Sequence, residues 1–168
     1  DSTNKNIGIE YYDTAFKILK KNKLNLELPI YGGFYAGNDA YYLIEGQNNT
    51  DEDDNLEVIR MIKYDTNWNR LGAASITGNT SIFGGEVRYP FDAGNVEMIE
   101  VNNKIYIVTG HEGYVDSAVG QGHQGYLMIE IDKNTLTGKI VEADLYHSFS
   151  QYIEQNDSNM YVLELSEG

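Results

Sequence analysis

The chain has 168 residues, with 17 Gly, 14 Tyr and only two Pro, a composition typical of turn-rich β-sheets. It has no Cys, which excludes disulfides and thiolate metal sites. Its formal net charge of −14 would repel the phosphates of nucleic acids and anionic lipids, and no apolar run approaches the roughly 20 residues of a membrane-spanning helix. The sequence therefore predicts an all-β protein with no nucleic-acid partner and no membrane insertion.

A short motif occurs three times, as Tyr12-Asp13-Thr14, Tyr64-Asp65-Thr66 and Ile131-Asp132-Lys133. Each copy places an Asp after an apolar or aromatic strand end and before a polar turn that leads to another strand. The copies are roughly 50 and roughly 70 residues apart, a spacing near the top of the range for a propeller blade with a loop insertion. The motif predicts a repeated β unit.

A second series lies between these copies, at 40–44, 104–108 and 159–163. Each member is a short β-branched or aromatic run preceded by Asn, Asp, Gly or Ser, which predicts the second strand of a hairpin. Both series together predict a β-propeller-like domain of four-stranded blades. Two full blades, 30–77 and 95–146, are flanked by a half blade at each end, 1–28 and 147–168.

In the first half, strands are expected at 7–12 and 16–28, with a helix over 14–23 as the alternative. The blade that follows is expected to have strands at 30–36, 40–46, 57–64 and 70–76. The basic cluster Lys17, Lys20, Lys21 and Lys23 is interpreted as a solvated edge, with an anion-binding patch as the alternative. Trp68, in the turn after Asp65, is expected to cover a blade edge rather than to stack on a ligand.

The stretch 47–55 is polar throughout and predicts a solvated loop. Asp51, Asp53, Asn55 and Glu57 alternate as in the opening of a calcium loop, so a calcium site is the alternative. Leu56 stands where an EF-hand needs Gly, which argues against that alternative.

The two half blades are complementary, since 1–28 supplies the last two strands of a blade and 147–168 the first two. Closure within one chain would give a ring of three blades, fewer than the usual four to eight, and is disfavoured. The expected partner is another copy of the chain, joined in a closed ring or a fibre, or the remainder of a longer polypeptide.

All three histidines lie in the second half of the chain, within candidate ligand-binding elements. The candidate ligand-binding residues are His111, Glu112, Tyr114, His123, Gln124, His147 and Gln151. His111, Glu112, His123 and His147 also have the side-chain types of a divalent metal site, although their spacing matches no standard motif. The competing interpretation makes His123 and His147 polar anchors between blades. No cofactor is predicted apart from this divalent metal ion.

Residues 110–125 hold five glycines and are expected to form a long connection within the second full blade. Tyr114, Tyr126, Tyr146 and Tyr152 are typical strand residues, and the alternative is an aromatic platform for carbohydrate. An enzyme is disfavoured, because no nucleophile-elbow sequence surrounds Ser148 or Ser150. A metal-dependent or carbohydrate-active enzyme fragment that uses His111, His123 and His147 stays open as the alternative.

The runs Pro90-Phe91-Asp92-Ala93-Gly94-Asn95, His111-Glu112, His123-Gln124 and His147-Ser148-Phe149-Ser150-Gln151 follow one another in the second half. Over about residues 79–168 the chain resembles a propeller-like region of large secreted or wall-associated proteins of Firmicutes, in which similar His-Glu, His-Gln and His-Ser-Phe-x-Gln elements recur in this order. The resemblance implies architecture and a secreted or cell-surface location. The expected function is that of a bacterial extracellular structural or adhesive binding module.

Overall fold

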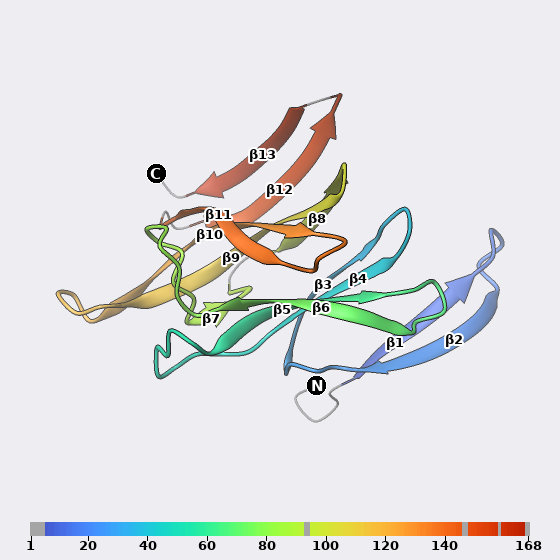
Figure 1. The fold of residues 1–168 in the computed structure, drawn as a ribbon, viewed down its shortest axis with the longest axis horizontal. Helices are drawn as coiled ribbons and strands as arrows, with labels where there is room; N and C mark the ends of the chain where they lie inside the picture. Colours follow the sequence, from blue (N-terminus) through green and yellow to red (C-terminus); the bar gives the residue numbers. More distant parts are fainter. Residues whose placement is uncertain (1–5, 93–94, 146–147, 158, 167–168) are drawn as a thin grey trace.

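A computed structural model describes residues 6–92, 95–145, 148–157 and 159–166. Across these ranges the chain forms β-strands, turns and loops, and the strands make four antiparallel sheets that follow one another along the sequence (Figure 1). The all-β prediction is confirmed. The described residues contain no helix with the length and apolarity needed to cross a membrane.

The first sheet is a hairpin of β1 (Asn6–Tyr12) and β2 (Ile18–Asn25). Ile7 pairs with Leu24 and Glu10 with Lys21, so the chain here is extended and has its hydrogen-bond partners on the neighbouring strand. The alternative of a helix over 14–23 is wrong. Its apolar residues can be placed on one helical face, but pairing with β1 satisfies the backbone groups across the hairpin instead.

The second sheet contains β3 (Ile30–Ala36), β4 (Tyr41–Gly46), β5 (Glu57–Tyr64) and β6 (Arg70–Thr77), side by side in that order. The strands expected in this region are confirmed to within a residue at each end. In β4, Tyr42 and Ile44 are buried on one face of the sheet and Leu43 on the other. A strand covered on both faces explains the continuous apolar run of β4.

The third sheet contains β8 (Val96–Val101), β9 (Lys104–Asp116), β10 (Gln121–Asp132) and β11 (Gly138–Asp144), and the short β7 (Tyr89–Pro90) also pairs with β9. The long connection expected at 110–125 is wrong, because β9 and β10 remain paired as far as Asp116 and Gln121. Four of the five glycines lie in these two strands, and Gly120 lies in the turn between them. A Cβ at Gly125 would overlap the carbonyl oxygen of Asp144 at the end of β11, so Gly lets β10 and β11 approach there.

The fourth sheet is a hairpin of β12 (Ser148–Asn156) and β13 (Asn159–Ser166). On β12, Gln151 and Ile153 are buried. On β13, the apolar side chains from Met160 to Leu163 and that of Leu165 are exposed. One face of β12 is therefore packed, and β13 lies at the surface.

The three Asp motifs form the same turn in three sheets. Asp13 Oδ1 accepts hydrogen bonds from the backbone N–H groups of residues 15 and 17, Asp65 Oδ1 from those of 67 and 69, and Asp132 Oδ1 from those of 134 and 135. Each turn contains one residue in the left-handed region, Phe16, Trp68 or Leu136. The turns join β1 to β2, β5 to β6 and β10 to β11, so each copy of the motif forms the same local turn between two strands.

The main core lies between the second and third sheets and includes Ile44, Met61, Ile107 and Ile129. The sheets follow one another as stacked layers, with the two hairpins at opposite ends (Figure 1). Contacts connect the second sheet to the third and the third to the fourth, since β3 lies against β8, β6 against β11 and β8 against β12. None of the sheets closes on itself within the described ranges, and a propeller stays a prediction.

The polar loop expected at 47–55 is present, but it is not simply solvated. Asn49 is buried, its backbone N–H donates to the Arg88 carbonyl at 2.8 Å, and its Nδ2 donates to the Tyr114 hydroxyl at 3.1 Å. Its Oδ1 accepts the N–H of Asp53 at 2.9 Å. The loop, which follows β4 of the second sheet, is therefore attached to the third sheet, because the Asn49 side chain bonds to Asp53 within the loop and to Tyr114 on β9.

Candidate functional site

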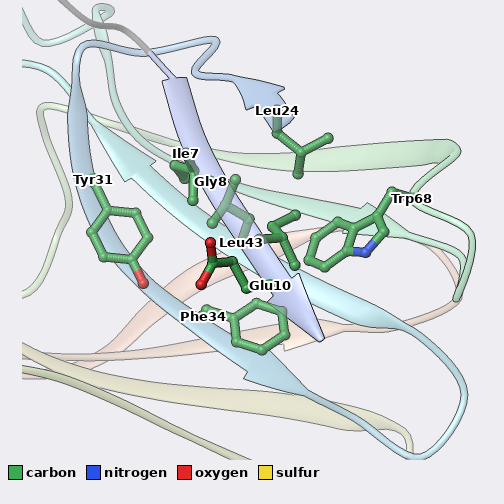
Figure 2. A pocket seen from close by; sticks show the side chains of 9 residues that line it. Ile7, Gly8, Glu10, Leu24, Tyr31, Phe34, Leu43 and Trp68 are labelled. Carbon is green, nitrogen blue, oxygen red and sulfur yellow. The ribbon is translucent and has the colours of Figure 1, made fainter. Parts of the chain in front are cut away.

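An aromatic groove, with a cavity volume of about 260 Å³, lies where the first hairpin rests on the second sheet (Figure 2). It is open to solvent and mostly apolar. Its walls come from β1, β2, β3 and β4 and from the turn between β5 and β6. The lining residues are Ile7, Gly8, Ile9, Glu10, Leu24, Tyr31, Phe34, Leu43 and Trp68.

The groove exists because the two-stranded hairpin covers only part of a four-stranded sheet. Ile7 and Leu24 pack against a small cluster of Leu43, Ile62 and Tyr64 on the second sheet. On β3, the side chains of Tyr31 and Phe34 remain 49% and 44% exposed. In Figure 2 these two rings lie on one side of β1, and Leu24 and Trp68 lie on the other. The uncovered part of the sheet is thus its β3 edge.

Trp68 forms the centre of an aromatic cluster at the groove. Its ring centroid lies 4.7 Å from that of Tyr41, 5.6 Å from that of Tyr64 and 5.7 Å from that of Phe34. Its Nε1–H donates to the hydroxyl of Tyr11, which ties the turn after β5 to the first hairpin. Such rings add about 0.5–1.5 kcal/mol per pair beyond their buried area. Trp68 therefore fixes the wall of the groove.

Glu10 is the one carboxylate among the residues that line the groove. Hydrogen bonds from Lys21 and then from Tyr12 lower the pKa of this exposed carboxyl group. The groove is suited to receive an apolar surface with a polar rim.

His111 lies on β9 and is completely buried. Its Nε2 is 2.9 Å from the carbonyl oxygen of Gly84. Burial lowers the pKa of the imidazole to about 4, against an opposing effect of the nearby carbonyl groups. The ring is therefore neutral at pH 7 and joins β9 to the segment before β7.

Glu112 follows His111 on the same strand, so the two side chains point to opposite faces of the sheet. Glu112 Oε1 lies 3.3 Å from Arg88 Nη1, and Glu112 pairs across the ladder with Gln124. The Nε2 of Gln124 donates to Asp92 Oδ2 at 2.9 Å. These candidate ligands belong to hydrogen-bond networks between neighbouring segments, and the structure does not bring His111 and Glu112 to one site.

The other predicted residues lie in different places. Tyr114, on β9, contacts the polar loop through Asn49, and His123 lies on β10 beside a β-bulge. Gln151 is buried on β12, and its backbone exchanges two hydrogen bonds with the side chain of Asn95, at 2.8 and 2.6 Å. His147 and Tyr146 lie outside the described residues.

No group of three or more His, Asp or Glu residues is arranged to hold a metal ion within the described part of the chain, the 51–57 loop included. A site that includes His147 stays a prediction.

Sequence reasoning missed Tyr31 and Phe34, which provide the exposed rings of the groove. A signal was present in Tyr31-Gly32-Gly33-Phe34, where two glycines separate two aromatic residues. A Cβ on Gly33 would lie only 3.2 Å from Val96 of the third sheet, so the glycines allow close packing on one face. The aromatic residues are consequently left on the other face, which is exposed.

Comparison of the chain with protein-family models, with curated proteins and with solved structures finds no match. The function is therefore inferred from the fold and the groove.

Proposed function

We propose that this chain is a propeller-like structural and adhesive module of a bacterial extracellular protein, which binds by completing its two-stranded end sheets with another polypeptide chain. The sheets that follow one another along the sequence have two, four, five and two strands, and the fifth strand of the third sheet is the two-residue β7. In a propeller, radially repeated four-stranded sheets place equivalent strands next to each other. The contacts of β3 with β8, of β8 with β12 and of β6 with β11 support this arrangement.

The observation that carries the proposal is the incompleteness of both end sheets. Each has two strands where the sheets between them have four or more, and each has strand edges that pair with nothing in the described chain. A two-stranded sheet is marginally stable alone, and an exposed apolar edge is a template for pairing with another chain. A surface of this kind is suited to receive strands from a partner.

The bacterial extracellular setting rests on the resemblance of residues 79–168 to wall-associated proteins of Firmicutes and on composition. The chain contains no Cys, and its net charge of −14 favours solubility. A metal-dependent enzyme gains no support from His111, because that imidazole is buried and already bonded to Gly84.

The experiment is a measurement of the native particle by native mass spectrometry and sedimentation over a range of concentrations, in parallel with a glycan array. We expect reversible association into particles of two or more chains. A chain that stays monomeric up to its solubility limit would contradict the proposal. If that monomer also bound glycans, the groove would instead belong to a carbohydrate-binding module.

A further inference from the structure

The two end hairpins together have the parts of one complete four-stranded sheet. We propose that β13 of one copy pairs with β1 of a second copy, which gives the antiparallel order β12-β13-β1-β2 across the contact. This inference rests on the proposed function and names the partner and the surfaces that meet. β12 already contacts β8 and β9 in its own copy, and β1 borders the open groove over β3. The edges of β13 and β1 therefore adjoin the uncovered parts of the neighbouring sheets.

The apolar face of the fourth sheet matches the groove. Tyr152 pairs with Leu163 and Ser150 with Leu165, so Tyr152, Leu163 and Leu165 share the face opposite to that of buried Ile153. All three are exposed, Leu163 at 61%. Covering them removes apolar surface from water at about 25 cal/mol per Å².

The orientation follows from the way each hairpin packs. The Ile7 and Leu24 face of the first hairpin lies on the second sheet, and the Ile153 face of the fourth sheet lies toward the third. In one continuous sheet the Ile7 face would continue into the opposite face of the β12–β13 hairpin, the face of Leu163. Leu163 and Leu165 would then cover the exposed rings of Tyr31 and Phe34 in the second copy.

The charges are complementary on the opposite face of the joined sheet. The first hairpin has four Lys, at 17, 20, 21 and 23, against Glu10 and Asp13, in a chain whose net charge is −14. Lys23 is exposed and pairs with Gly8, on the face opposite to that of Ile7. That face would lie over β10 and β11, where Glu142 is exposed.

The same surface of β10 and β11 is acidic around Tyr126. Burial and then the nearby carboxylates of Glu142, Glu164 and Asp144 raise the pKa of this hydroxyl to about 12. One of these, Glu164, comes from β13, which places the free β13 edge beside the acidic surface. A lysine-rich hairpin is thus the piece of this chain that fits there, since opposite charges attract across a contact.

The first test compares Leu163→Lys with Val119→Lys, a control with a side chain of similar exposure, 59%, in the turn between β9 and β10. Both replace an exposed side chain, so both variants should keep the fold, which circular dichroism checks. We expect Leu163→Lys to weaken self-association at least about tenfold and Val119→Lys to change it less than about twofold. Equal effects of the two variants would overturn the proposal.

The second test reverses one charge at each surface, with Lys23→Glu and Glu142→Lys. Each variant alone should associate about threefold more weakly, and an equimolar mixture should recover close to wild-type affinity, because the swapped residues then face each other. If the wild-type chain associates but the mixture does not recover, this contact is refuted while the proposed function stands. A wild-type chain that never associates refutes the proposed function itself.

Discussion

Lys133 connects the second and third sheets, and its removal should cost more stability than the loss of any ion pair at the surface. Its Nζ lies 2.7 Å from Asp39 Oδ1, in the turn after β3, and it also bonds to Glu100 Oε1 on β8. The side chains of Lys133 and Glu100 are 7% and 6% exposed, whereas that of Asp39 is 51% exposed. The buried Lys133–Glu100 pair should therefore dominate the effect.

Lys133→Met keeps most of the side-chain volume and removes the ammonium group. Removal of one partner of a buried pair costs about 3–5 kcal/mol, because the other charge stays buried without compensation, while an exposed pair contributes about 0–1 kcal/mol. We expect a loss of about 3 kcal/mol in the free energy of unfolding, measured by urea denaturation. Adding Glu100→Gln should recover at least half of this loss, since it removes the uncompensated carboxylate.

The pH dependence gives an independent check. Burial opposes ionisation of Glu100, but hydrogen bonds from Lys133 and Asn38 outweigh it and lower the pKa of the carboxyl group. The stabilisation is thus present above the unfolded pKa of about 4.5 and is lost as the pH falls through the lower folded pKa. Lys133→Met should reduce this acid-side loss. A stability change below about 1 kcal/mol, or no recovery in the double variant, would refute the reasoning.

Three further predictions concern other parts of the molecule. The pKa of His111 is about 4 in the fold and about 6.5 unfolded, so its contribution to the free energy of unfolding is present above pH 6.5 and falls by about 3 kcal/mol as the pH drops to 4. In urea titrations at a series of pH values, His111→Gln should abolish this part of the pH dependence of stability. An unchanged pH dependence would contradict the assignment. Gly125→Ala should lower the unfolding free energy by about 2 kcal/mol or more, because the new Cβ would meet the backbone of Asp144. Gly8→Ala is the control, because a Cβ at Gly8 has no atom within 4 Å. Equal melting temperatures of the two variants would contradict the close approach of Gly125 to Asp144. Ile7→Lys should detach the first hairpin from the second sheet and shift the fluorescence emission of Trp68, the only Trp, to longer wavelength. Phe16→Ser, at an exposed position, is the control and should leave the emission unshifted. An unshifted spectrum for Ile7→Lys would show that the packing of the hairpin on the sheet does not depend on Ile7.

The strands of the second sheet and the three Asp turns could be predicted from the sequence because their causes are local. The carboxylate of Asp13, Asp65 or Asp132 bonds backbone groups two to four residues away, so the motif forms the turn whatever surrounds it. Alternation and β-branched runs likewise mark strands before any partner is known. The all-β class and the pairing of residues 7–12 with the following strand depend on such neighbours.

The site depended on tertiary structure, because burial is decided by what a distant sheet places against a residue. Nothing near His111 in the sequence shows that Gly84 covers its ring, or that Asn49 in a polar loop becomes a buried link to Arg88. Glycines at 110–125 indicate a loop, and only the pairing of β9 with β10 and the approach of Gly125 to Asp144 on β11 show that most of them lie in strands. The groove over Tyr31 and Phe34 exists only because two strands cover part of a four-stranded sheet, and no local pattern specifies how far such coverage extends.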